Sequence, residues 1–372
     1  MPQASQHMPS RLENGGTRQT FDCDLRRWIQ GYPISSCTLV ATAGGLHRLH
    51  QAQVIPDSSS FGRFIQVAPG LLTLSGLKRA WLPGGGAILA IGGGSVLDAA
   101  KILLLCDALG CEPSDNLFER YMEVQEAAPL ICVPTTVGSG SEITPTAAVW
   151  DDRTKRSFDA PILQPAAALY DPSLLRTSPL DVLVASAWDA TSHALEALWS
   201  RRSTSLSTDD ALGALRVLVP ALIGRQAGLL EQLDQIQRAG AIAGRAIAVT
   251  RTGIGHALSY ELTARHGLPH GLAASLFCLA VAPIVIEQEN RIGRTLADAL
   301  RCSRFEIHDL LLEAWISSGA NTITGRYVTP GDIQQSALVA PNPERADLSV
   351  IKPDRELICS FAAGLLRGSR GR

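Results

Sequence analysis

Four residues in the second half of the chain carry side chains that could hold a metal ion. Asp189 and His193 lie four positions apart in SAWDATSHALEALWS, while His256 follows Gly255 in GHALSYEL and His270 comes fourteen residues later. Positions four apart share one helix face, so Asp189 and His193 can reach the same ion. One carboxylate and three imidazoles suit Fe²⁺, Zn²⁺, Co²⁺ or Ni²⁺ and leave a coordination position open. An open position predicts Lewis-acid chemistry on an oxygen atom.

The same residues also have a structural interpretation. Taken singly, an aspartate in a helix is often a cap, and a histidine on an apolar helix face is often a satisfied core residue. The four residues together, in a helical region that follows a nucleotide-binding pattern, favour the metal site.

A glycine turn is the second feature with chemical meaning. Gly92-Gly93-Gly94-Ser95 follows the apolar run 87–91 and leads into the helical pattern 95–109, with Asp98 expected in the first turn. Glycines let the backbone approach an anion, and a helix N-terminus offers free N–H groups. The loop 134–142, PTTVGSGSE, supplies hydroxyls at the end of another strand. Each alone could be an ordinary tight turn or a Ser/Thr-rich loop, but both on one sheet predict a nucleotide site.

The elements that must position these residues change character along the chain. Strand patterns at 37–42, 87–91, 129–135 and 146–151 alternate with helical patterns, which is typical of a mostly parallel sheet covered on both faces. From residue 178 onward, apolar residues recur at helical intervals. We therefore expect a disordered tail over 1–20, a dinucleotide-binding α/β domain over 21–177, and an all-α metal-binding domain over 178–372.

The composition excludes several classes of protein. A net charge of -2 over 372 residues provides no electrostatic footprint for nucleic acid. The first twenty residues lack the apolar core of a signal peptide, and no uninterrupted apolar run reaches the ~18 residues of a membrane span. The richest run, 101–110, is broken by Asp107. The eight cysteines are scattered without a CxxC pair, so we expect buried thiols in a reducing compartment, the cytoplasm.

Four segments together resemble a known family. GGGSVLDAAK, PTTVGSGSE, DATSHALEA and GHALSYELTARHGLPHG occur in the order and spacing of the iron-containing (group III) alcohol dehydrogenases, over roughly residues 35 to 365. The resemblance implies an N-terminal Rossmann-like domain, a helical C-terminal domain, NADH or NADPH, a divalent metal with Fe²⁺ first and Zn²⁺ as the alternative, and a homodimer or larger homo-oligomer. It implies metal ligands at Asp189, His193, His256 and His270, and cofactor contacts at Gly92, Gly93, Gly94, Ser95, Asp98, Thr135, Thr136, Ser139 and Thr144.

The chain departs from the family pattern at three positions. Tyr260 stands four residues after His256, where the family often has a histidine near the proton path. We predict that Tyr260 relays the proton, with His266 as the alternative acid or base. A lysine common in a later strand is replaced by Ser157, although Lys155 lies two residues earlier on the same face. Ala43 replaces an aspartate of NAD-preferring members, so a 2′-phosphate is not repelled and NADPH is allowed.

The segments SHALEALW, GHALSY and TKRS resemble the phosphonoacetaldehyde reductase branch of that family. This implies a small anionic aldehyde, phosphonoacetaldehyde, reduced to 2-hydroxyethylphosphonate in phosphonate biosynthesis. A phosphonate needs cationic or N–H partners, for which the alternative role is a solvated surface charge. The candidates are Lys155, Arg156, Arg201, Arg202 and Arg265.

Other functions stay open from the sequence. The chain could be a dehydrogenase for another small alcohol or diol, or a dehydroquinate-synthase-like lyase that uses NAD transiently. A third alternative is a non-catalytic metal- or nucleotide-binding protein, which only Tyr260 favours.

Overall fold

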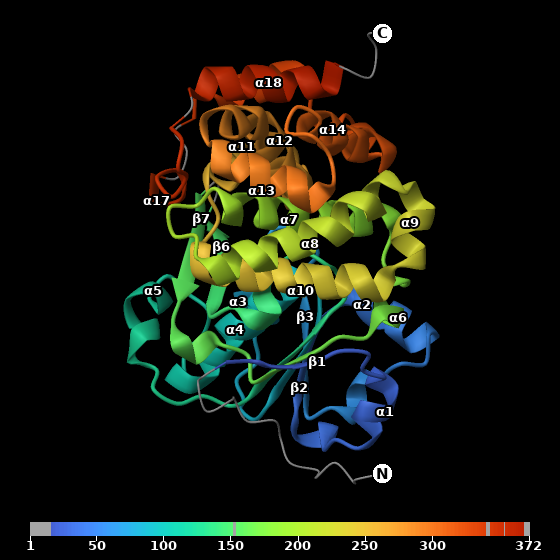
Figure 1. The fold of residues 1–372 in the computed structure, drawn as a ribbon. Coiled ribbons are helices and arrows are strands. Elements are labelled where there is room, and N and C mark those ends of the chain that lie inside the picture. The colour runs from blue at the N-terminus through green and yellow to red at the C-terminus, as the bar shows by residue number, and fades with distance from the viewer. Residues whose placement is uncertain (1–15, 152–153, 340–342, 353, 368–372) are drawn as a thin grey trace. The chain divides into compact units, whose positions relative to one another are not determined.

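The chain forms two compact units, one built from residues 1–135 and 141–177 and the other from residues 136–140 and 178–372 (Figure 1). The computed structural model describes residues 16–151, 154–339, 343–352 and 354–367. Most of the tail expected over 1–20 lies outside the described residues. The expectation is wrong for Arg18–Thr20, which form strand β1 and pair with Ala167–Leu169.

A six-stranded sheet is the centre of the first unit. Its strands are β1 (Arg18–Thr20), β2 (Thr38–Thr42), β3 (Arg63–Val67), β4 (Ile88–Gly92), β5 (Leu130–Pro134) and β8 (Ala167–Leu169). The strand order is β1-β8-β5-β4-β2-β3, and every pairing is parallel, which confirms the predicted fold class.

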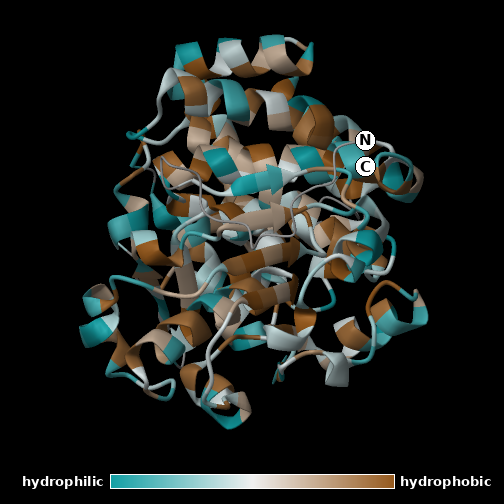
Figure 2. Cartoon of the chain, turned by 90° about the horizontal axis from the view of Figure 1, so that it is seen from below, coloured by the Kyte–Doolittle hydropathy of each residue, from teal (hydrophilic) through white to brown (hydrophobic). Residues whose placement is uncertain are grey.

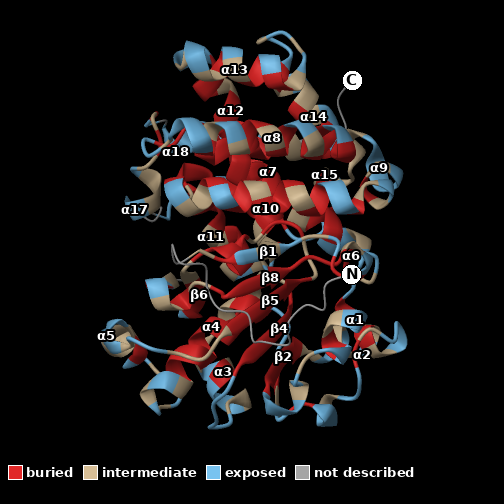
Figure 3. Cartoon of the chain, turned by 60° about the horizontal axis from the view of Figure 1, so that its bottom comes forward, coloured by how far each residue is buried: buried red, intermediate tan, exposed pale blue. Residues whose placement is uncertain are grey.

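Both faces of this sheet are buried, which explains why its strands are continuous apolar runs. Leu39 and Leu89 belong to one core cluster, whereas the neighbouring Val40 and Ala90 belong to the other. Figure 2 shows the strands as mainly hydrophobic, and Figure 3 shows them as buried. The helical segments of this unit are α1 (Leu25–Gln30), α2 (Ala43–Gln51), α3 (Leu74–Ala80), α4 (Gly94–Leu109), α5 (Leu117–Arg120), α6 (Pro172–Leu175) and the 3₁₀ turns η1 (Ile34–Ser36), η2 (Ser58–Ser60), η3 (Tyr121–Glu123), η4 (Ser141–Ile143) and η5 (Pro161–Leu163).

The expected strand 146–151 exists, but it lies outside the parallel sheet. It forms β6 (Thr146–Asp151), which pairs antiparallel with β7 (Thr154–Asp159) in a two-stranded sheet. Helix α4 packs against β2, β4 and β5 and also contacts β6. The hairpin is therefore attached to the helix that follows the glycine turn.

The second unit is helical in its described residues. Its helices are α7 (Leu180–Leu198), α8 (Ser205–Ile223), α9 (Arg225–Glu231), α10 (Leu233–Thr250), α11 (Ile254–His266), α12 (His270–Gln288), α13 (Asn290–Leu300), α14 (Ile307–Ser317), α15 (Ala320–Thr324), α16 (Pro330–Ser336), α17 (Pro343–Ala346) and α18 (Arg355–Arg367). Helix α7 packs against α8, α10 and α12, and α11 packs along α12. Figure 3 shows α7 as largely buried.

Helix α12 is the most apolar helix of this unit. Among the described residues it alone is long and apolar enough to cross a membrane, and 83% of its most apolar stretch is buried inside the protein. A core helix has the same composition as a spanning one, so burial accounts for it. The richest apolar run is therefore α12, and the expectation that it is 101–110 is wrong.

Candidate functional site

Helix α7 supplies the carboxylate and one imidazole of the candidate metal cluster. The helix is buried along almost its whole length, so polar side chains in its middle need partners inside the protein. The side chains of Asp189 and His193 are only 14% and 5% exposed. Their spacing of four residues places both on one face, as predicted from the sequence.

The other two histidines lie near the starts of two helices that pack together. His256 is the third residue of α11, and His270 is the first residue of α12. Gly267 ends α11 in the left-handed conformation, with φ of 67°, which lets the chain turn back. A Cβ on Gly271 would meet the carbonyl oxygen of Ala185 at 2.2 Å, so only glycine lets α12 begin this close to α7.

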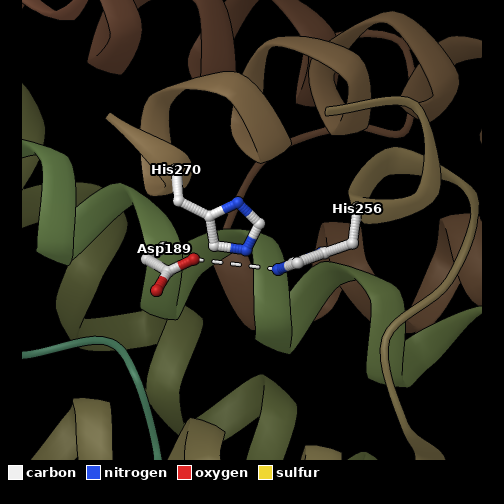
Figure 4. A group of neighbouring side chains, drawn as sticks. All are labelled: Asp189, His256 and His270. Atoms are coloured by element: carbon white, nitrogen blue, oxygen red, sulfur yellow. Dashed lines mark ion pairs between the residues drawn. The ribbon is translucent and has the colours of Figure 1, made fainter. Parts of the chain in front are cut away.

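Three of the four predicted ligands converge closely (Figure 4). Ligand atoms of Asp189, His256 and His270 all lie within 4.8 Å of one another. The distance from Asp189 Oδ1 to His256 Nε2 is 3.7 Å, and that to His193 Nε2 is 3.9 Å. The rings of His193 and His256 stack with centroids 4.8 Å apart, so His193 borders the group without belonging to its tightest part.

The cluster has the polar atoms and charges that a divalent cation requires. Asp189 Oδ1 and His256 Nε2 are buried without a hydrogen-bond partner, and 3.7 Å is too long for one between them. Burial opposes ionisation of Asp189, but the neighbouring histidines hold its pKa below the usual range. Burial lowers the pKa of His193 to about 4, which leaves a neutral imidazole. Anionic carboxylate and neutral imidazole are the metal-binding forms, so Asp189 and His193 suit a divalent metal. Burial opposes protonation of His256, but Glu196 and Asp189 raise its pKa, so a metal would replace a proton on that ring.

Glu196 belongs to this site, although the sequence analysis did not single it out. Its fully buried carboxylate lies 2.7 Å from His256 Nδ1 and accepts hydrogen bonds from the backbone of Gly253 and Gly255. Burial opposes its ionisation, but His256 and the backbone N–H groups of Gly253 and His256 lower the pKa of Glu196. The spacing from Asp189 through His193 to Glu196 places all three on one face of α7, which was the signal available in the sequence.

The two candidate proton-transfer residues occupy different ends of α11. The ring of Tyr260 lies 6.0 Å from that of His270, centroid to centroid, with an interplanar angle of 29°. His266 lies in the last turn of α11, close to Asp332 of α16. Hydrogen bonds from Thr329 lower the pKa of Asp332, and His266 contributes less to the same shift. Tyr260 is therefore next to the cluster, while His266 is not among its close ligand atoms. Both roles stay predictions.

The glycine turn lies at the switch point of the parallel sheet. Strand β2 pairs with β3 on one side and with β4 on the other, so the turns after β2 and β4 leave adjacent strand ends. Open α/β sheets bind ligands at such a point. Helix α4 begins at Gly94, and its N-cap Gly93 has no side chain to cap the helix. This end fits a pyrophosphate group, for which free N–H groups and the helix dipole are suited.

Helix α4 begins at Gly94, one residue earlier than expected, and Asp98 does not lie in its first turn. The Asp98 carboxylate accepts hydrogen bonds from Ser141 Oγ at 2.6 Å and from the Ala148 backbone at 3.0 Å. Burial raises the pKa of Asp98. Buried Lys101 donates to the carbonyls of Thr144 and Thr146. In this structure Asp98 therefore ties α4 to the 141–148 segment.

The remaining predicted cofactor residues are divided between the units. The Thr135 backbone donates to the Gly92 carbonyl at 3.0 Å, which links the second loop to the glycine turn. Thr136 and Ser139 belong to the other unit, whose segment 136–140 is held by a hydrogen bond from the Val137 backbone to Ser186 Oγ of α7. The contacts of these residues with a cofactor stay predictions.

The candidate phosphonate-binding cations have protein partners where the structure shows them. Arg156 lies over the Phe118 ring at 3.6 Å and pairs with Asp115 and Asp151. Arg201 donates to the carbonyls of Ser349 and Val350, and Arg265 pairs with Glu261 one turn away. Lys155 is partly buried on β7, and Arg202 is exposed. Arg201 and Arg202 lie together because they are adjacent in the sequence.

Two family models match the chain. The model described as iron-containing alcohol dehydrogenase matches residues 76–172, and that of the C-terminal part of the Fe-containing alcohol dehydrogenase family matches residues 183–314. Together they cover more than half of the chain.

Individual relatives agree with the family models. The chain is 36% identical over 198 residues to a phosphonoacetaldehyde reductase of Streptomyces viridochromogenes, covering 50% of each chain. It is 32% identical over 204 residues to a bifunctional aldehyde-alcohol dehydrogenase of Escherichia coli, covering 51% of this chain and 23% of that one. The chain thus spans half or less of these two curated relatives.

A solved structure shows the same fold at lower identity. The sulfoacetaldehyde reductase of Bifidobacterium kashiwanohense, in complex with NAD⁺, superposes with a TM-score of 0.74 at 19% identity over 98% of this chain and 99% of that one. At this identity the likeness establishes the fold.

Proposed function

Because the chain belongs to the iron-containing alcohol dehydrogenase family, we propose that it is a metal-dependent, NAD(P)H-linked reductase of a small aldehyde. We propose phosphonoacetaldehyde as the aldehyde and 2-hydroxyethylphosphonate as the primary alcohol formed. The relative in Streptomyces viridochromogenes supports this choice, at 36% identity over half of the chain. In this proposal the enzyme belongs to phosphonate biosynthesis in the cytoplasm and forms a homodimer or larger homo-oligomer.

The observation that carries the proposal is the buried cluster of Asp189, His256 and His270, bordered by His193. Two of its ligand atoms face each other at 3.7 Å without a hydrogen bond, as expected of side chains arranged around an ion. Fe²⁺ is the proposed metal and Zn²⁺ the alternative, since both accept imidazole and carboxylate ligands.

In this proposal the chain has a metal site and a separate cofactor site. When bound, a divalent metal supplies Lewis-acid polarisation of the carbonyl and a nicotinamide supplies hydride. Asp189, His193, His256 and His270 would hold the metal, and Gly93 and Gly94 at the start of α4 would bind the pyrophosphate. Tyr260 would donate the proton that the alcohol oxygen requires, because its ring lies beside His270.

The cofactor preference is proposed to include NADPH. Ala43, the first residue of α2, directly follows β2 at the switch point and carries no carboxylate. A ribose 2′-phosphate would meet no negative side chain at that position.

The test is a cofactor-oxidation assay with the metal-loaded protein. We expect NADPH or NADH to be consumed with phosphonoacetaldehyde at a kcat/KM at least tenfold above that for propionaldehyde, because a phosphonate adds charge-assisted contacts. Equal efficiency on both aldehydes would remove the phosphonate substrate. Turnover without net cofactor oxidation would favour the lyase alternative.

A ligand variant tests the metal dependence of the same assay. His256→Ala should lower kcat/KM by roughly 100-fold or more and reduce bound metal. The substitution removes one ligand and thereby weakens binding of the metal that acts as the Lewis acid. The matched control is His308→Ala, a histidine of α14 in the same unit, which should keep activity and metal. Full activity of the His256 variant without metal would contradict the proposal.

A further inference from the structure

We propose that Glu196 is a positioning residue for the metal centre, which caps α11 from the side and holds the His256 imidazole with the same carboxylate. The proposal rests on the proposed function only in that a metal binds beside His256. It concerns a residue that would not ligate a metal held beside Asp189, because its carboxylate lies at Nδ1 of the His256 ring and Asp189 lies at Nε2.

The Glu196 carboxylate is surrounded by hydrogen-bond donors. Oε2 accepts from the Gly253 backbone at 2.6 Å and lies 2.7 Å from His256 Nδ1. Oε1 accepts from the backbone of Gly255 at 2.7 Å and of His256 at 3.3 Å. Three backbone N–H groups and one ring nitrogen thus converge on one buried side chain, which is the pattern of a carboxylate that orients a metal ligand.

The backbone donors are those that begin helix α11. The first N–H groups of a helix have no partner within it, and a side chain at the N-cap usually satisfies one of them. Here the N-cap is Gly253, which has no side chain, and Glu196 of α7 takes its place. Ser349 Oγ accepts from the Ile254 backbone at 3.2 Å, so it caps the same helix without contacting His256.

Close packing restrains the carboxylate in this arrangement. A Cβ on Gly255 would lie 3.0 Å from Glu196 Oε1 and 2.5 Å from Cys278 Sγ, so a larger residue could not occupy this position without displacement. The GIG segment before His256 therefore has glycine where the carboxylate approaches the backbone. The imidazole and the first turn of its helix are fixed by one group.

The geometry also fixes which ring nitrogen faces the cluster. Since the carboxylate already accepts three backbone hydrogen bonds, it acts as an acceptor toward the ring, and His256 Nδ1 carries the hydrogen. In the neutral ring the lone pair is then on Nε2, the nitrogen that lies 3.7 Å from Asp189. Glu196 thereby selects the tautomer that can bind a metal on the Asp189 side.

The experiment compares Glu196→Gln with the matched control Ser349→Ala in the full chain. Glutamine keeps the size but turns one acceptor into a donor against a ring or backbone N–H. Zn²⁺ affinity, measured by competition with a chromogenic chelator, should fall 10–100-fold in the Gln variant, as for other outer partners of metal ligands. Ser349→Ala, which removes only a cap, should bind Zn²⁺ within about threefold of wild type.

Two further measurements separate positioning from folding. In the Co²⁺-loaded protein the d–d absorption bands should shift in Glu196→Gln and remain unchanged in Ser349→Ala, because only the former changes the His256 ligand. In the Zn²⁺-loaded wild type labelled with ¹⁵N in its histidine rings, we expect Nδ1–H and metal-bound Nε2 at His256. This second measurement needs no variant to fold.

Three outcomes would overturn the inference. One is Zn²⁺ bound to His256 through Nδ1. Another is wild-type affinity in Glu196→Gln, and the third is a loss in Ser349→Ala as large as that in the Gln variant. Wild-type protein that binds no metal at all would remove the proposed function and this inference with it, whereas the first three outcomes leave the proposed function intact.

Discussion

Tyr260 is one of the residues at which this chain departs from the pattern of its family, and its ring lies beside His270. If its hydroxyl donates the proton, Tyr260→Phe keeps the ring contact and removes only that donor. We expect kcat to fall by roughly 100-fold, the lower range for general acid catalysis. Bound metal should stay at the wild-type level, because the substitution leaves the carboxylate and the imidazoles of the cluster unchanged.

A restoring variant serves as the control for this prediction. Tyr260→His introduces the side chain that the family often carries four residues after its third ligand, so it should keep much of the activity that Phe loses. Steady-state kinetics and metal analysis on the three proteins decide the matter. A Phe variant with wild-type kcat would assign the proton to another donor, and His266 would be the next residue to test.

The candidate metal ligands could be named from the sequence because the evidence for them is local. Asp189 and His193 share a helix face by their spacing alone, and His256 and His270 stand beside turn-forming glycines. Glu196 was missed because its donors lie 57 to 60 residues away along the chain. A carboxylate inside a helix looks the same in a sequence whether it faces solvent or a buried imidazole.

The charged residues near the expected substrate show the same limit. Arg201 was a candidate for phosphonate, yet its guanidinium donates to the carbonyls of Ser349 and Val350, which are 148 and 149 residues away. Only the folded chain places these carbonyls within its reach.

Among the elements, the start of α12 is the one on which the cluster depends most. Gly271→Ala would place a Cβ 2.2 Å from the Ala185 carbonyl and 2.6 Å from Asp189 Cβ. We expect a loss of about 1–3 kcal/mol in the free energy of unfolding, typical of overpacking, and weaker Zn²⁺ binding because α12 must move from α7. Urea unfolding and chelator competition measure the two effects.

Gly213 inside α8 provides the matched control, since a Cβ there meets nothing within 4 Å. Gly213→Ala should raise the free energy of unfolding by about 0.5–1 kcal/mol through helix propensity and leave metal affinity unchanged. Equal stability and equal affinity in the Gly271 variant would show that the α7–α12 contact does not determine the site.

The inner strands β2, β4 and β5 were predictable, but the edge strands β1 and β3 were not. Sequence patterns identify β2, β4 and β5 within one residue or so, because buried parallel strands are apolar runs. Strand β1 has three residues and exists through pairing with β8, whose Ala167 is opposite Arg18. Strand β3, RFIQV, mixes polar and apolar residues at the sheet edge. For such strands tertiary pairing decides more than local pattern.

At the scale of the whole molecule, the two bound groups should stabilise different parts. All four predicted metal ligands belong to the helical unit, whereas the glycine turn belongs to the α/β unit. Saturating Zn²⁺ at 100 times its Kd should add about 2.7 kcal/mol to the free energy of unfolding. Hydrogen exchange should slow in α7, α11 and α12, because these helices carry the ligands.

NADPH is the control for that experiment. It should slow exchange at the N-terminus of α4, around Gly94, rather than in α11. Protection of α4 by Zn²⁺ with none in α7 would contradict the assignment of ligands. Removal of Zn²⁺ with EDTA should reverse both the stabilisation and the protection.

The division of the chain has a consequence for how the protein is made. Residues 136–140 belong to the helical unit although the residues on both sides belong to the α/β unit, so the chain passes between the units at three points. The Val137 backbone N–H donates to Ser186 Oγ, 49 positions later, so this hydrogen bond can form only after Ser186 has been synthesised. During synthesis the sheet's strands up to β8 leave the ribosome first. A metal centre that includes His270 can assemble only after the whole α/β unit has been synthesised.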